Sequence, residues 1–273
     1  MPLSLRNYGL LLVAAFAFAQ CANLKEVNAF AVSSQRILDR NRSAVFGYAS
    51  YSHDSTIIFN YLPDHLRDLD CRCDLAKQMD SHIASEYSIL SAYFAALARF
   101  ADPQAFVNFA PMSAPLPAGT YGSVNISVQE ATLASRLSTA LTALATTGYK
   151  AKKIPGFIAT YRDSVAPLLE LLKIRADNLS GRIINLQLQL DRVADSLISF
   201  AQDKAVKMPV VFAYDAKRKE LDATLAAYQA RVHDLETIIS GGQLIVDNID
   251  KLHEQAFKDK MMSIVNALSA NVH

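Results

Sequence analysis

Residues 161–200 read YRDSVAPLLELLKIRADNLSGRIINLQLQLDRVADSLISF, and apolar side chains return in this stretch every three or four positions. Such spacing places them along one side of an α-helix, in the seven-residue repeat of helices that pack as coiled coils. The apolar series is Tyr161, Val165, Leu168, Leu172, Ala176, Leu179, Ile183, Leu186, Leu190, Val193, Leu197 and Phe200. One extra four-residue step near Leu172 interrupts the repeat, as a stutter does. At about 1.5 Å per residue the helix is roughly 60 Å long, so it must pack beside other long helices.

The C-terminal third of the chain supplies such partners. Residues 221–239 continue the same spacing, and residues 245–268 resume it. Gly241 and Gly242 lie between the two series, and glycine is the usual residue just after the end of a helix. The pattern therefore predicts that one helix ends at the glycine pair and that an antiparallel helical hairpin follows.

Three further helices are indicated upstream. Apolar series cover residues 24–38 and 79–97. Ser127 is followed three positions later by Glu130, the pattern of a capping box at the start of a helix that Gly148 closes. No persistent alternation of apolar and polar residues occurs, so almost no sheet is expected. We predict an all-α fold, an elongated bundle of long antiparallel helices with coiled-coil-like packing, as a single domain over residues 21–273.

Two segments lack this periodicity and are predicted to connect helices. The first is residues 47–63. The second, residues 102–123, contains four prolines and two glycines and so cannot form a regular helix. It is nevertheless apolar, and we expect it either to fold over the end of the bundle or to bind a partner. Its candidate partner-binding residues are Phe106, Phe109, Met112, Leu116 and Tyr121.

The N-terminus has the features of a secretory signal. Arg6 precedes about eleven uncharged, mostly apolar residues, a length that suits a signal peptide and is too short to span a bilayer. Residues 1–20 are therefore predicted to be a signal peptide. Cleavage after Ala19 would release a soluble periplasmic or secreted protein. Lipidation of Cys21, in a segment similar to a lipobox, would instead anchor the protein in the outer membrane, facing the periplasm.

The two remaining cysteines form the sharpest local motif, Cys71-Arg72-Cys73. In an oxidising compartment the pair favours a disulfide, with free thiols as the alternative. A zinc site completed by His65 and His82 is a third reading, but the histidine spacing fits no usual ligand pattern. If Cys21 is lipidated, the mature chain keeps an even number of cysteines.

Composition restricts the possible functions. Of the 273 residues, 51% are hydrophobic and 19% charged, which excludes a disordered chain and a multi-span membrane protein. A formal net charge of +1 gives no general attraction to nucleic acid, and the short basic clusters have no aromatic platform beside them. No nucleophile elbow, phosphate loop, dinucleotide fingerprint or paired-histidine metal motif occurs.

We therefore expect no catalytic residues, no metal and no cofactor. The favoured function is that of a non-enzymatic scaffold or interaction protein of the cell envelope, with an envelope protein as its partner and the membrane reached through a lipid anchor. It could also pair with a second copy of itself. The alternatives are a membrane-active, pore-forming-like helical protein with residues 102–123 as the inserting element, and a thiol–disulfide protein that uses Cys71 and Cys73.

Overall fold

The computed structural model describes residues 24–43, 47–60, 71, 73–102, 117–121, 124–147, 154–201 and 203–270. This part of the chain is 88% helical, which confirms the all-α prediction. No helix within it is both long enough and apolar enough to cross a membrane. The predicted signal peptide and Cys21 lie outside the described residues.

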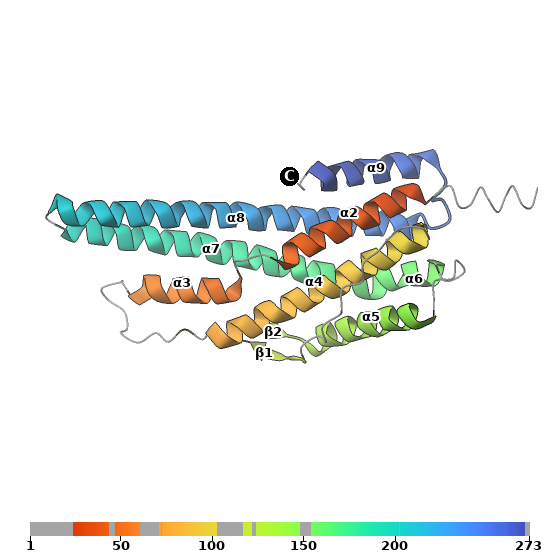
Figure 1. Ribbon diagram of the computed structural model, residues 1–273, viewed down its shortest axis with the longest axis horizontal. Helices are drawn as coiled ribbons and strands as arrows, with labels where there is room; N and C mark the ends of the chain where they lie inside the picture. The colour runs from red at the N-terminus through yellow and green to blue at the C-terminus, as the bar shows by residue number, and fades with distance from the viewer. Residues whose placement is uncertain are drawn as a thin grey trace, which may run out of the picture.

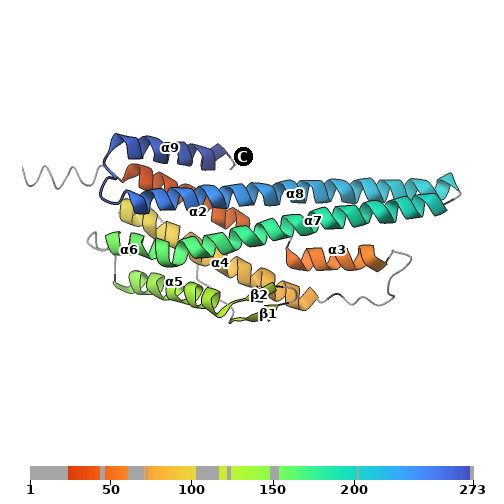
Figure 2. The same ribbon diagram turned by 180° about the vertical axis from the view of Figure 1, so that it is seen from behind.

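Figure 1 shows an elongated bundle, in which two long antiparallel helices run the length of the molecule and shorter elements lie alongside much of that length. In chain order the elements are α2 (Lys25–Arg42), α3 (Tyr48–Asn60), α4 (Cys73–Ala101), β1 (Gly119–Tyr121), β2 (Val124–Ile126), α5 (Val128–Thr147), α6 (Ile154–Thr160), a π-helical turn (Tyr161–Val165), α7 (Ala166–Phe200), α8 (Lys204–Asp247) and α9 (Gln255–Ala270). The two strands pair antiparallel, with Tyr121 opposite Val124. The view from behind shows α5 and α6 on the opposite side of α4 from α2 (Figure 2).

Helix α4 lies at the centre of the bundle. Every residue from Ser85 to Ala98 is buried, so this helix is enclosed on all sides rather than on one apolar stripe. Many of these residues are alanine or serine. Their small side chains let α2 pack closely against α4. Phe30 of α2 meets Phe94 edge to face, with ring centroids 5.8 Å apart.

Helix α8 continues through Gly241 and Gly242, so the predicted break at this glycine pair is wrong. A Cβ atom at Gly241 would collide with the ring of Phe30, and one at Gly242 would collide with the ring of Tyr161. The Tyr161 hydroxyl donates to the backbone carbonyl of Ile239, over a distance of 3.1 Å. The glycines therefore serve close helix packing, and the chain turns only after Asp247.

The segment from 47 to 63 was predicted to be a connection, but its first part is helix α3. Its apolar residues are poorly segregated, which is why no helical stripe is visible in the sequence. The start of the helix is stabilised from another element, because the Asp80 carboxylate of α4 accepts hydrogen bonds from the backbone N–H groups of Tyr48 (2.8 Å) and Ala49 (3.0 Å). A carboxylate in this position satisfies backbone donors that a helix N-terminus leaves unpaired.

A π-helical turn, which the sequence pattern did not predict, joins α6 to α7. Pro167 follows it directly at the start of α7. Proline has no N–H to donate to the carbonyl four residues earlier, Asp163, and its ring crowds that carbonyl. A wider turn at Tyr161–Val165 relieves this conflict and keeps both helices continuous.

The buried apolar side chains form two separate clusters. The larger one joins α2, α4, α5, α6 and α9 to the start of α7 and the end of α8. The smaller one joins α3, the start of α4 and β2 to the middle of both long helices. Leu172 belongs to the first cluster and Ala176 to the second, so the boundary between them crosses α7 at Arg175.

Candidate functional sites

A buried cluster of four charged or titratable side chains occupies the boundary between the two apolar clusters. His82 and Glu86 come from α4, Glu130 from α5 and Arg175 from α7, and all four residues are at most 7% exposed. The His82 Nε2 atom lies 3.1 Å from one oxygen of each carboxylate. The Arg175 guanidinium donates to Glu86 Oε2 at 2.5 Å and also to Glu130 Oε1. We call these four residues the charge cluster.

Glu130 joins the charge cluster instead of completing the predicted capping box. The backbone N–H of Glu130 does donate to the Ser127 hydroxyl, over 3.1 Å, which confirms the serine part of that prediction. The Glu130 carboxylate is bonded instead to His82 and Arg175. Its place in the first turn of α5 is favourable, because the N-terminus of a helix stabilises negative charge.

The pKa values of the two carboxyl groups of the charge cluster are shifted in opposite directions. Burial raises the pKa of Glu86 above its usual value of 4.5. Burial alone would also raise the pKa of Glu130, but hydrogen bonds from His82 and Arg175 outweigh it and lower that pKa to about 2. Burial alone would lower the pKa of His82, yet its bonds to Glu130 and Glu86 outweigh that effect and raise the pKa above 6.5. When His82 is protonated, its charge and that of Arg175 balance the two carboxylates.

The charge cluster is also the group of described residues that could hold a metal ion. One ligand atom from each of His82, Glu86 and Glu130 lies within 4.8 Å of the others. The guanidinium of Arg175, however, already bonds both carboxylates. A divalent cation would have to displace Arg175, whose charge cannot be removed by deprotonation. We therefore interpret the cluster as a self-neutralising ionic layer.

A polar cavity of about 200 Å³ adjoins the charge cluster and shares Arg175 with it. It lies where the end of α2 and the start of α3 meet α4, α7 and α8. Its polar and aromatic lining consists of Asn41, Arg42, Tyr48, Asp80, Tyr87, Arg175, Tyr228 and Arg231. The sequence pattern indicated none of these residues as a site. They come from five elements, and no local pattern in any one of these elements distinguishes them as a site.

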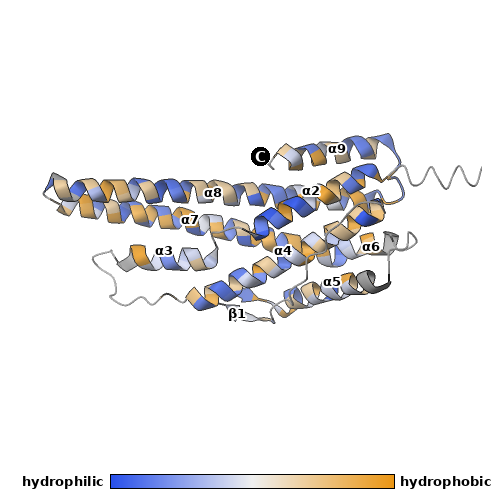
Figure 3. Cartoon of the chain, viewed as in Figure 1, coloured by the Kyte–Doolittle hydropathy of each residue, from blue (hydrophilic) through white to orange (hydrophobic). Residues whose placement is uncertain are grey.

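The far end of the α7–α8 hairpin exposes large apolar side chains. The predicted apolar series along α7 is buried as far as Val193, apart from the half-buried Leu190, but Leu197 is 38% exposed and Phe200 is 78% exposed. On α8, Met208 is 55% exposed and Phe212 is 64% exposed. Figure 3 shows hydrophobic residues continuing along both helices to this end. We call Leu197, Phe200, Met208 and Phe212 the hairpin tip.

An apolar groove begins beside the hairpin tip. Its volume is about 430 Å³, and it lies between α3 and the two long helices. Its apolar walls are Ile57, Ile58, Leu190, Val193, Ala194, Leu197, Val210 and Ala213. Lys217 and Asp54 also line it, and they form an ion pair of 2.8 Å. The groove and the tip share Leu197.

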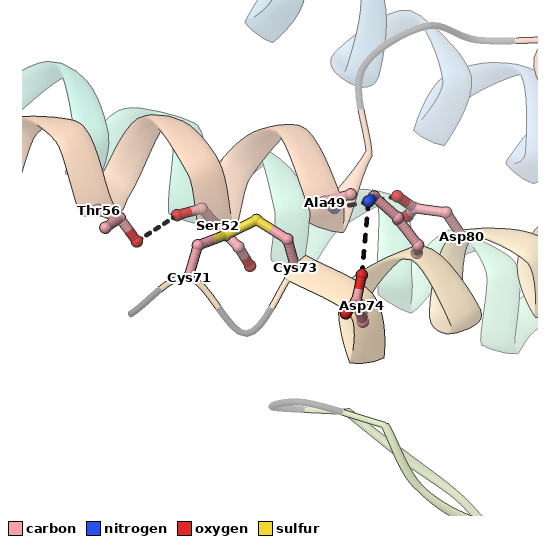
Figure 4. The surroundings of a disulfide bond; sticks show 8 residues. Ala49, Ser52, Thr56, Cys71, Cys73, Asp74 and Asp80 are labelled. Atoms are coloured by element: carbon pink, nitrogen blue, oxygen red, sulfur yellow. Dashed lines mark hydrogen bonds and ion pairs between the residues drawn. A yellow bond between two sulfur atoms is a disulfide. The ribbon is translucent and has the colours of Figure 1, made fainter. Parts of the chain in front are cut away.

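The two cysteines lie close together, in the position that the predicted disulfide requires. Figure 4 shows Cys71 and Cys73 bonded just before and at the start of α4, beside Ser52 and Thr56 of α3; the two Cα atoms lie 5.0 Å apart. His82 belongs to the charge cluster, and cysteines joined in a disulfide offer no thiolate to a metal, so the structure gives no support to the zinc alternative. The two cysteines are only two positions apart in the sequence, so a bond between them constrains the chain locally, at the start of α4.

The predicted partner-binding loop is only partly described. Tyr121 is a half-buried residue of β1, and its hydroxyl donates to the Pro117 carbonyl at 2.9 Å. Phe106, Phe109, Met112 and Leu116 lie outside the described residues, so their role stays a prediction.

No protein-family model matches the chain, and neither a curated protein nor a solved structure resembles it significantly. Function therefore has to be inferred from the chemistry of the charge cluster, the polar cavity and the hairpin tip.

Proposed function

We propose that this chain is a non-enzymatic interaction protein of the cell envelope, which binds an apolar segment of a partner protein with its hairpin tip and the adjoining groove. The observation that carries the proposal is the exposed continuation of the α7 series at Leu197 and Phe200. Side chains that follow the spacing of a buried seam, but are covered by none of the described helices, are suited to a seam completed by another molecule.

The shape of the groove suits an amphipathic helix. Its walls extend over two turns of α7, from Leu190 to Leu197, and over two turns of α8, from Val210 to Lys217. A groove of this kind accepts apolar side chains spaced three or four residues apart on a docking helix. Aromatic side chains such as Phe200 and Phe212 would supply most of the binding energy, as buried anchors do at protein interfaces.

The charges near the tip favour a protein partner over a lipid surface. The residues from Asp191 to Arg218 include four acidic and five basic side chains. Binding to anionic lipid requires an excess of Lys and Arg near the apolar residues. In addition, the start of α2 and the hairpin tip lie at opposite ends of the molecule (Figure 1). A lipid anchor at Cys21 would therefore hold the tip away from the anchoring membrane.

The envelope location rests on the predicted signal and on Cys21. Replacing Cys21 with Ser should release the protein from the membrane fraction while export continues. A wild-type protein that is already soluble and begins at Gln20 would contradict lipidation, although it would leave the proposed binding surface unchanged.

Site-specific photocrosslinking tests the binding surface. A photoreactive phenylalanine analogue at position 212 should give a discrete protein adduct in cells. The same analogue at position 229, an exposed site on α8 about 25 Å away, should not. Phe200→Ser combined with Met208→Ser should abolish the adduct without changing the melting temperature, because both side chains are exposed.

Other outcomes would overturn this assignment. Equal adducts from positions 212 and 229 would show that the tip is not specific. Adducts to lipid, together with flotation on anionic vesicles, would favour the membrane-active alternative. An adduct with a second copy of this chain would identify the hairpin as a homo-oligomer interface.

A further inference from the structure

The polar cavity carries more cationic than anionic groups on its walls. Three guanidinium groups line it, those of Arg42, Arg175 and Arg231, whereas Asp80 is its one lining carboxylate among the described residues. Five helices meet around this space, so the arrangement is fixed by tertiary packing and does not belong to one exposed helix face. An excess of arginine in a recess between helices is typical of carboxylate and phosphate recognition.

Each carboxylate in and around the cavity has its own partner. Asp80 accepts the two backbone N–H groups at the start of α3. Glu86 and Glu130 are bonded to Arg175 and His82.

Two carboxylates that lie outside the cavity lining also have partners. Asp234 pairs with Arg40 at 2.7 Å. Asp39, one turn before Arg42 on α2, accepts a hydrogen bond of 2.9 Å from Ser91. These carboxylates therefore do not neutralise Arg42 and Arg231 by direct pairing.

Arg42 and Arg231 have no carboxylate partner among the described residues. The Arg42 guanidinium donates to the hydroxyl of Ser88 at 3.2 Å. The Arg231 guanidinium lies over the ring of Tyr228, 4.3 Å from its centroid. Both contacts are with neutral groups, so neither supplies a carboxylate to these two guanidinium groups.

The cavity also has neutral donors on its walls. The Asn41 side chain is almost fully buried, and its nitrogen has no hydrogen-bond partner in the described part of the chain. Burial raises the pKa of Tyr48 and of Tyr87, so both hydroxyl groups stay protonated at neutral pH. A buried donor without a partner is unfavourable, and a ligand oxygen would remove that penalty.

We propose that the polar cavity binds a small molecule through a carboxylate or phosphate group, with the guanidinium groups of Arg42 and Arg231 as its charged partners. The Asn41 amide adds a neutral donor, and the tyrosine rings enclose the rest of the ligand. A volume of about 200 Å³ admits a small organic anion and excludes a peptide or a nucleotide chain. This site is separate from the hairpin tip and does not depend on the function proposed for it.

Calorimetric titration tests this inference with two probes, inorganic phosphate and succinate, at constant ionic strength. We expect saturable binding of at least one probe with a Kd below about 1 mM, and the stronger probe identifies the preferred oxyanion. Arg42→Gln and Arg231→Gln should each weaken binding about 10-fold or more, since each removes a charge-assisted bond. Arg192→Gln, at an exposed arginine on the distal part of α7, should leave binding unchanged.

A second measurement uses the wild-type protein and so does not depend on how the variants fold. Phenylglyoxal modifies accessible arginines, and saturating probe should protect Arg42 and Arg231 but not Arg192, as read by peptide mass spectrometry. Absence of saturable binding for both probes, or equal modification of Arg42 and Arg192 with and without probe, would overturn the proposal. Phe212→Ser should not alter probe binding, which keeps this test distinct from that of the hairpin tip.

Discussion

Arg175 is a charged residue on the buried side of a long helix, where a cation is stable only if carboxylates meet it. Glu86 and Glu130 provide them from two other helices. The three-helix contact therefore depends on one side chain. Removing one partner of a buried ionic group is much more costly than removing the whole group, because the remaining charges stay buried without compensation.

Arg175→Met should lower the free energy of unfolding by about 3–5 kcal/mol, since two carboxylates would lose their cation inside the bundle. Urea denaturation at neutral pH measures this. Arg192→Met is the matched control at an exposed position, and it should change stability by less than about 0.5 kcal/mol. Similar effects from the two substitutions would contradict a buried ionic layer.

The charge cluster also predicts how stability depends on pH. The pKa of Glu130 is lower in the folded protein than in the unfolded chain, so its stabilisation is present above pH 4.5 and is lost as the pH falls toward 2. The pKa of His82 is higher in the folded protein, so its stabilisation is present below pH 6.5 and is lost as the pH rises through the folded value. Glu130 and His82 together therefore favour a stability maximum between about pH 4.5 and 6.5, and the raised pKa of Glu86 adds to the decline as the pH rises.

The His82→Gln variant separates the two limbs of this profile. It keeps a side chain that can donate a hydrogen bond but does not titrate. Urea midpoints measured across the pH range should then lose part of their alkaline decline and keep their acidic one. An unchanged alkaline limb would mean that another group controls it.

A signal for Arg175 was present in the sequence but is easy to misread. Strict alternation of four- and three-residue steps from Leu168 passes through Leu172 to Arg175 and then Leu179. Choosing Ala176 in place of Arg175 keeps the series apolar, and with Arg175 the extra four-residue step falls between Leu179 and Ile183 instead. A charged residue at a seam position is instead a known device for fixing register, and it predicts a buried partner. Glu86 lies three residues after Ile83 and four before Leu90, so it also occupies a seam position. The identity of the partners could not be predicted, because it depends on how α4, α5 and α7 pack.

At the scale of single elements, the glycines of α7 and α8 illustrate how local preference and packing compete. Gly181 is exposed on α7, and a Cβ atom there would contact nothing within 4 Å. Gly242 lies inside α8, where a Cβ atom would collide with Tyr161. The sequence pattern alone treats a glycine pair as a helix end, because the local signal contains no information about a distant ring.

Gly181→Ala should stabilise the protein by about 0.5–1 kcal/mol, since alanine favours helix and reduces the entropy of the unfolded chain. Gly242→Ala gains the same local preference but should destabilise by about 1–3 kcal/mol, because the packed Tyr161 ring has to move. Thermal denaturation of the two variants side by side checks this. Stabilisation by both would mean that α8 does not pack closely on Tyr161.

Helix α3 was missed for a related reason. Its sequence lacks an apolar stripe, and the Asp80 carboxylate that caps it lies more than thirty residues away. By contrast, the long α7 helix and the start of α5 were predicted, because their signals are local: a sustained heptad and a capping serine.

At the scale of the whole molecule, elongation follows from helix length. Long seams can be covered only by other long helices, so the all-α bundle could be predicted from apolar spacing alone. The division of the interior into two apolar clusters with an ionic layer between them could not be predicted, because it requires knowing which helices meet. The candidate sites follow the same rule. The polar cavity is assembled from five elements and is not visible in any one segment.

The antiparallel register of the hairpin provides a way to alter its length. Asp191 of α7 pairs with Arg218 of α8 at 2.7 Å, and Gln187 donates to Asp222 at 2.8 Å. Residues 187–193 therefore face residues 216–222. Deleting both segments removes one heptad from each arm, which preserves the seam and shortens the hairpin by about 10 Å.

The bundle thus places a rod between the ionic layer and the exposed phenylalanines, and Arg175 and Phe200 are separated along it by about 38 Å. For a protein tethered at its other end, such a rod sets the distance at which a partner can be engaged. The shortened variant keeps all four residues of the hairpin tip, although it loses Leu190, Val193 and Lys217 of the groove, so it should still contact its partner through the tip in detergent extract, where nothing constrains position. It should not contact the partner in the intact envelope, where the partner lies at a fixed distance from the membrane. Restoring seven residues to each arm should restore that contact. Equal contact by both lengths in the envelope would show that the hairpin does not act as a spacer.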